Sequence, residues 1–266
     1  MKSMIGKLNI KSLVLLLITL AGIGSVFIME PIPQDPNYHL FADCRHISFI
    51  PNFWNVVSNI PLLIVGMLGI FLLLPKKQNG AIQELWLNNL VFFIGIFLIG
   101  IGSGYYHWNP NSESLVWDRL PMTISFMAFF SIIIGESVSI KSGKQILWAL
   151  ILMGFMSIAY WQMTESRGRG DLRFYALVQF LPMVLISIIL GMYKVNRNLK
   201  IYFWLVLLSY AIAKLFETGD YYVFTSTNLI SGHSIKHVMA ALGPLIYLAV
   251  LYKRKNSEKT KTKPII

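Results

Sequence analysis

The sequence predicts an all-α membrane protein built as a bundle of transmembrane helices. Of its 266 residues, 55% are hydrophobic and only 13% are charged, and apolar runs recur along almost the whole chain, too many for one soluble core. An outer-membrane barrel would instead show alternating polar and apolar residues in short segments, a pattern that this sequence lacks. A helix needs roughly 20 residues to cross about 30 Å of hydrocarbon. Apolar runs of about this length lie at 12–29, 53–74, 87–107, 120–138, 145–161, 174–192, 201–217 and 235–252.

The distribution of basic residues predicts how these helices are oriented. Lys and Arg concentrate in alternate segments, which places both termini in the cytoplasm by the positive-inside rule, whereas the loops on the other side hold only Arg45, Arg119, Arg167, Arg169 and Arg173. The net charge of +11 therefore reflects membrane topology. The tail 253–266 is expected to be cytoplasmic and to interact with membrane lipids. We expect no nucleic-acid partner, because no aromatic residues interleave its charges.

The chain divides into four segments on this reading. Residues 1–29 are expected to form an N-terminal membrane anchor helix; a cleaved signal peptide is the alternative, but the apolar stretch is long for one. Residues 30–52, with four prolines, are expected to form an irregular extracytoplasmic cap. Residues 53–252 would then hold seven helices in one domain. The single cysteine, Cys44, excludes an intramolecular disulfide.

Small and polar residues within the runs predict close helix packing. Gly100 and Gly104 have the GxxxG spacing, with Gly95 and Gly102 nearby, so the third helix is expected to approach a neighbour closely. Hydrogen bonds between helices are favoured over substrate contacts for the polar side chains of the second helix, which are Trp54, Asn55, Ser58 and Asn59.

Two acids near the outer end of the seventh helix have two possible roles. Glu217 and Asp220 could support a metal-bound imidazole, or could form ion pairs with Lys214 or Lys236. We favour the ion pairs.

Five polar residues are predicted to share the outer depth of the bundle. Ser103 and His107 lie one turn apart at the end of the third helix, and Asp118 opens the fourth. His233 and His237 begin the last helix at i and i+4, so both imidazoles project from one face. Ionisable side chains at membrane depth are costly, so each requires a partner or a task.

This constellation is suitable for a zinc site. Three imidazoles, from His107, His233 and His237, would leave one tetrahedral position for water, whose pKa zinc lowers to about 7. Asp118 could then exchange a proton with that water, and Ser103 could hydrogen-bond the water or a developing oxyanion. One alternative remains open: the histidines could be interfacial residues that bind no metal. A Ser-His-Asp triad with Ser103 as nucleophile is disfavoured, because His233 and His237 indicate that Ser103 assists a zinc-bound water instead.

The same residues resemble the alkaline ceramidase family, within a superfamily of seven-helix membrane hydrolases that includes the adiponectin-type receptors. The resemblance rests on "FWNVVSN" at 53–59, on Ser103-x3-His107 followed by Asp118 in "WDRLPM", and on His233-x3-His237. It covers roughly residues 43–250. The implied fold is a seven-helix bundle of alkaline ceramidase type starting at 53, with an additional N-terminal transmembrane helix.

The resemblance implies a zinc-dependent amidase of sphingolipid metabolism that cleaves ceramide, or a ceramide-like lipid, to a long-chain base and a fatty acid. By motif, His107, His233 and His237 would bind zinc; Asp118 would be the general base and acid, and Ser103 its helper. The family's calcium-binding segment reads "DCRHISFIPNFWN" here, with few carboxylate oxygens, so a tight calcium site is not expected.

Other functions are compatible with this scaffold. A receptor or signalling module with a structural zinc site is one alternative, and a hydrolase of a different lipid amide is another. A transporter is disfavoured, because its polar residues would lie at the bilayer midplane rather than at one outer edge.

Overall fold

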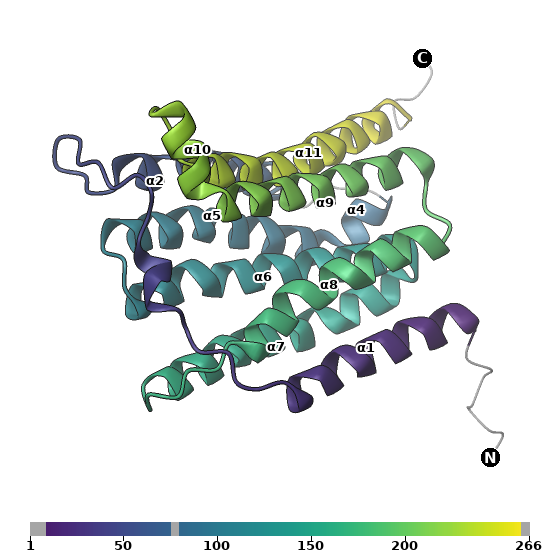
Figure 1. Ribbon diagram of the computed structural model, residues 1–266. Helices are drawn as coiled ribbons and strands as arrows, with labels where there is room; N and C mark the ends of the chain where they lie inside the picture. The colour runs from purple at the N-terminus through teal and green to yellow at the C-terminus, as the bar shows by residue number, and fades with distance from the viewer. Residues whose placement is uncertain (1–8, 76–79, 262–266) are drawn as a thin grey trace.

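The computed structural model describes residues 9–75 and 80–261, and the long elements among them are all helices. In this described part, eight helices are long and apolar enough to cross a membrane, which confirms the predicted all-α membrane fold and supports a multi-pass membrane protein. They lie side by side as a bundle (Figure 1). The spans are formed by α1 (Ile10–Ile28), α2 (Phe53–Val57) with α3 (Ile60–Leu73), α5 (Trp86–Trp108), α6 (Ser112–Ser137), α7 (Ile140–Glu165), α8 (Arg173–Met192), α9 (Arg197–Thr218) and α11 (Gly232–Lys261).

Short helices lie at the ends of the bundle. The segment expected to be an irregular cap contains one 3-10 turn, η1 (Pro36–His39), and α4 (Gly80–Glu84) precedes α5. Between the predicted runs 201–217 and 235–252 the chain forms a further short helix, α10 (Asp220–Thr227). The cap and α10 lie at the same end of the bundle, whereas α1 starts and α11 finishes at the opposite end (Figure 1).

The predicted second helix is interrupted in the structure. Its run folds as α2 and α3, with a turn at Ser58–Asn59 between them. Pro61 explains the break, because its ring clashes with a preceding carbonyl and it has no N–H to donate to the helix. The Asn59 side chain donates to the Asn55 carbonyl at 2.8 Å and so satisfies one freed acceptor.

Two other helices are longer than their hydrophobic runs. α6 begins at Ser112 rather than at 120, because Asn111 and Ser114 form a reciprocal capping box. Asp118 therefore lies inside the helix instead of at its start. α7 extends from Ile140 to Glu165 instead of 145–161, with Ser139 as its N-cap.

Glycines bring α5 against its neighbours, although not the pair expected. A Cβ on Gly102 would lie 1.8 Å from the Trp117 carbonyl oxygen of α6, and one on Gly95 would lie 2.4 Å from Ser125 Oγ of the same helix. Gly100 faces α3, whereas nothing lies within 4 Å of a Cβ on Gly104, so its predicted packing role was wrong. Gly95 and Gly102 are seven residues apart and share one face, which makes them the pair that contacts α6.

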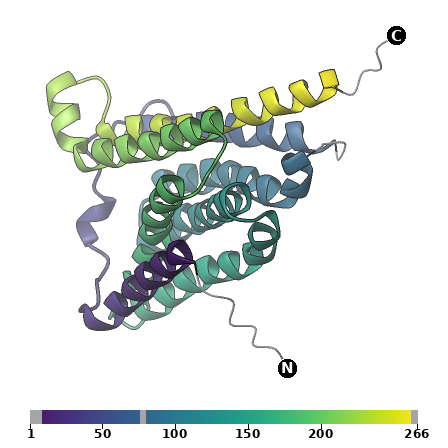
Figure 2. The ribbon, with the colours of Figure 1, turned by 90° about the vertical axis from the view of Figure 1, so that its right-hand side faces the viewer.

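The N-terminal helix α1 lies at the edge of the bundle, where it packs on few neighbours. Only Val26 of this helix is buried, and α8 is its main partner. Figure 2 shows α1 at the side of the bundle opposite α9 and α11. Most of its apolar side chains therefore face outward, as expected for a helix surrounded by lipid.

Candidate metal centre

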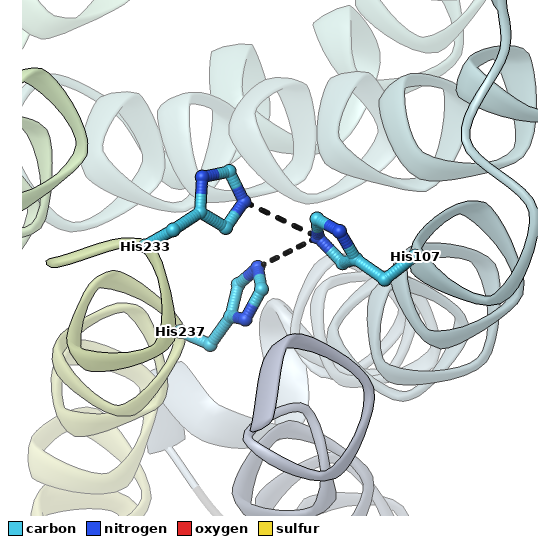
Figure 3. A group of neighbouring side chains, drawn as sticks. All are labelled: His107, His233 and His237. Atoms are coloured by element: carbon cyan, nitrogen blue, oxygen red, sulfur yellow. Dashed lines mark hydrogen bonds between the residues drawn. The ribbon is translucent and has the colours of Figure 1, made fainter. Parts of the chain in front are cut away.

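Three histidine side chains converge at the capped end of the bundle. His107 comes from the last turn of α5, and His233 and His237 come from the first turns of α11. Their rings point toward one another (Figure 3), and all three are at most 6% exposed. The Nε2 atom of His107 lies 3.2 Å from Nε2 of His233 and 3.2 Å from Nε2 of His237. Two tetrahedral ligands at the usual Zn–N distance would be about 3.3–3.4 Å apart, so the spacing fits a zinc ion.

The hydrogen bonds of the rings are consistent with Nε2 ligation. His237 Nδ1 lies 2.8 Å from Ser58 Oγ, and that hydroxyl also lies 3.3 Å from the Asn55 carbonyl. If the hydroxyl proton is directed to Asn55, Ser58 accepts from Nδ1–H, and the Nε2 lone pair of His237 is then free to bind a metal ion. The Nε2 atom of His107 contacts two other nitrogens, yet one ring nitrogen cannot both donate and accept. A cation at the convergence would satisfy all three lone pairs.

Residues from four segments support this cluster. The Asn55 side chain receives a hydrogen bond from Ser234 Oγ at 2.9 Å and so ties α2 to α11. Asp220 accepts from the backbone N–H of His233 at 2.7 Å and of Ala42 at 3.0 Å, which joins α10, α11 and the cap. Of the four polar residues of the second span, Asn55 and Ser58 contact α11, whereas the Asn59 side chain donates to carbonyls of its own span.

Glu217 forms the ion pairs that the sequence favoured. Its carboxylate contacts the ammonium groups of Lys214 and Lys236. Lys236 also lies 2.8 Å from Nε2 of His233. This ammonium group and a metal ion therefore compete for the same lone pair. Among the described residues, Asp220 does not form the expected ion pair with a lysine; its oxygens instead accept hydrogen bonds from backbone N–H groups.

A cavity of about 340 Å³ extends from the cluster into the bundle. Ser103, Asp118 and His237 line one end of it, and the Ser103 hydroxyl approaches the Asp118 carboxyl group. Both residues are buried, at 1% and 6% exposure. The rest of the wall is mainly apolar side chains from α5, α6, α8, α9 and α11. The structure thus brings together the five residues that the sequence singled out.

The cap closes the cluster on its outer side. The Phe41 ring packs on His107 and His233, with centroid distances of 4.7 and 4.9 Å. Both carboxylate oxygens of Asp43 are engaged by the guanidinium group of Arg45, at 2.8 and 2.7 Å. Asp43, the acid left in the calcium segment, could bind a cation only by giving up this pair. The role of Phe41 was not predicted, because a lone aromatic residue in a proline-rich segment has no periodic pattern.

Comparisons with known proteins agree with this geometry. A family model described as Ceramidase matches residues 42–265, which leaves α1 outside the match. The protein named "Putative alkaline ceramidase dcd3A" from Dictyostelium discoideum is 26% identical over 107 residues, which cover 36% of this chain and 37% of the relative. The match with this relative thus spans little more than a third of its length. The family match covers most of the chain and confirms the resemblance drawn from its motifs, so the chain belongs to the ceramidase family.

Proposed function

We propose that this protein is a zinc-dependent amidase embedded in the membrane, which hydrolyses ceramide or a ceramide-like lipid to a long-chain base and a fatty acid. One observation carries the proposal. Three histidine nitrogens converge, and one of these histidines, His237, lines a mainly apolar cavity together with the buried carboxyl group of Asp118. Such a cavity suits an acyl chain whose amide lies at the histidines.

The proposed roles follow from the positions of the side chains. His107, His233 and His237 would hold the metal ion. When bound, zinc supplies Lewis acidity that polarises the amide carbonyl and acidifies water. Asp118 takes a proton from the attacking water as the new C–O bond forms, and returns a proton to the amide nitrogen as the C–N bond breaks. Ser103 donates a hydrogen bond to the oxygen on which negative charge develops.

The catalytic reading is favoured over a structural zinc site. A structural site is normally closed by a fourth protein ligand, whereas the potential ligand group in the described chain consists of three histidines. A receptor on this scaffold would also have no need for a buried carboxyl group, Asp118, in the cavity that His237 lines. We further propose that both termini are cytoplasmic, that the active site lies near the extracytoplasmic face, and that residues 1–29 anchor the chain.

The test combines metal analysis with a lipid assay on the full chain in lipid nanodiscs. Purified protein should contain about one zinc per chain and release fatty acid from a ceramide panel. Asp118→Asn should keep the metal but lose about 10²–10⁴-fold in turnover. Glu113→Gln, an exposed acid on the same helix, is the matched control and should retain both.

Two results would overturn the proposal. Full hydrolysis by Asp118→Asn would remove the proposed general base. Zinc retained after His233→Ala and His237→Ala together would remove the proposed ligands.

A further inference from the structure

The residue after Asp118 is a buried arginine that forms no ion pair in the described part of the chain. Arg119 is 5% exposed. Its guanidinium carbon lies 4.6 Å from the ring centroid of Trp161, 4.9 Å from that of Tyr175 and 5.2 Å from that of Tyr38. These rings come from α7, α8 and the cap, so Arg119 occupies an aromatic cage at the outer end of the bundle.

The cage leaves the guanidinium group short of acceptors. In the part of the chain that the structure describes, Arg119 forms no ion pair, and its Nη1 atom is buried without a hydrogen-bond partner. Aromatic faces attract a cation, but five N–H donors require oxygen acceptors. An uncompensated buried charge is costly, which indicates that a ligand supplies the acceptors.

The surrounding charges also favour an anion. Arg119, Lys214 and Lys236 line the cavity together with only two acids, Asp118 and Glu217. Glu217 already pairs with both lysines, so its carboxylate is not available to Arg119. The nearby cap residue His39 is affected by this charge. Burial lowers the pKa of His39, and the positive charge of Arg119 lowers it further.

We propose that Arg119 binds an anionic group of the substrate, so that the preferred lipid amide carries a carboxylate or a phosphate close to the scissile bond. This inference rests on the proposed amidase function and specifies its substrate class. The planar guanidinium group matches the two oxygens of a carboxylate or phosphate. Asp118 and Arg119 are consecutive on α6, about 3.8 Å apart at Cα, and both line the cavity. One substrate could therefore present an amide to Asp118 and an anionic group to Arg119 within the same cavity, as in an N-acyl amino acid or a phosphorylated N-acyl sphingoid base.

The first experiment compares lipids of equal acyl length with the full chain in nanodiscs. The substrates are a neutral ceramide, an N-acyl amino acid and a ceramide phosphate, which separate carboxylate from phosphate. Wild type should hydrolyse at least one anionic lipid with a kcat/KM about tenfold or more above that of the neutral lipid. A tenfold ratio corresponds to about 1.4 kcal/mol, as expected for one additional ionic hydrogen bond to the substrate. Arg119→Gln should abolish this preference, mainly through KM, and Arg119→Lys should restore part of it. Arg169→Gln, an exposed arginine in an outer loop, is the matched control.

The second experiment measures binding without hydrolysis. Tetradecyl phosphate, tetradecanoate and tetradecanol are titrated into the Asp118→Asn protein and into Asp118→Asn combined with Arg119→Gln. The first protein should bind at least one of the two anions about tenfold more tightly than the alcohol, and the second should bind all three alike. Zinc content serves as the check that each variant is folded.

The outcomes separate this inference from the proposed function. Equal rates and equal binding for neutral and anionic lipids, or a preference that persists in Arg119→Gln, would overturn the anionic substrate while amide hydrolysis stands. Anion binding that depends on Arg119, in a protein that hydrolyses no amide, would support the anion site and refute the amidase.

Discussion

The hydroxyl group of Ser58 should control how tightly the histidine cluster binds metal. Ser58→Ala removes the hydroxyl group 2.8 Å from His237 Nδ1, which we expect to hold His237 in the tautomer with a free Nε2. Ser58 and His237 are 8% and 3% exposed, so bulk water is poorly placed to replace the bond. Losing such a partner costs about 10–100-fold in metal affinity, equivalent to about 1.4–2.8 kcal/mol.

The assay is a zinc titration against a competing chelator, performed on purified protein and independent of catalysis. Ser157→Ala is the matched control, because Ser157 is also buried but its hydroxyl donates to the Gly154 carbonyl of its own helix. We expect weaker zinc binding in the first variant and wild-type affinity in the second. Unchanged affinity in Ser58→Ala, or an equal loss in Ser157→Ala, would refute the role assigned to the hydroxyl group.

Three further predictions test packing, the cap and pH. Gly102→Ala should lower the melting temperature by several degrees, because its Cβ would meet a backbone carbonyl of α6, whereas Gly104→Ala, with open space, should melt as wild type. Phe41→Ala should speed zinc loss to a chelator up to about 30-fold, because two ring contacts, worth about 1 kcal/mol each, disappear from above the histidines. Burial alone would raise the pKa of Asp171, but hydrogen bonds from Arg173 outweigh it and lower this pKa to about 2. The ionised Asp171 therefore stabilises the fold fully above pH 4, and this stabilisation is lost as pH falls toward 2. Asp171→Asn should lower the free energy of unfolding by about 2 kcal/mol at neutral pH and by almost nothing at pH 2. Denaturant unfolding across this pH range measures the difference.

Hydropathy predicted the eight candidate spans of the described residues correctly, because each of them contains one long apolar run. The ends of the helices were less predictable, since a helix continues into polar residues wherever a cap such as Asn111 satisfies its first N–H groups. The same limitation hid α10, which contains no long apolar run. Pro61 was a visible signal for the break between α2 and α3, but a hydropathy window averages over it.

The histidine cluster was predictable because of two simple rules. Spacing of i and i+4 places His233 and His237 on one face, and alternating topology places His107 at the same end. Which side chains approach the cluster from other segments depends on tertiary packing, which spacing does not encode. Lys236 shows this difference, because the sequence offered it as a partner for Glu217, and the structure also places it 2.8 Å from His233 Nε2.

The contact of Gly102 with α6 links packing to the proposed chemistry. A Cβ there would meet the Trp117 carbonyl oxygen, so the glycine sets how closely the two helices approach just before Asp118 and Arg119. Ser103 follows Gly102 directly and faces the same cavity as those two residues. Any shift between α5 and α6 therefore moves the proposed base and the proposed anion-binding residue together relative to Ser103. Single substitutions can test the roles of Asp118 and Arg119 separately. A substitution of Gly102 affects both residues, because Gly102 determines the position of the backbone that carries them.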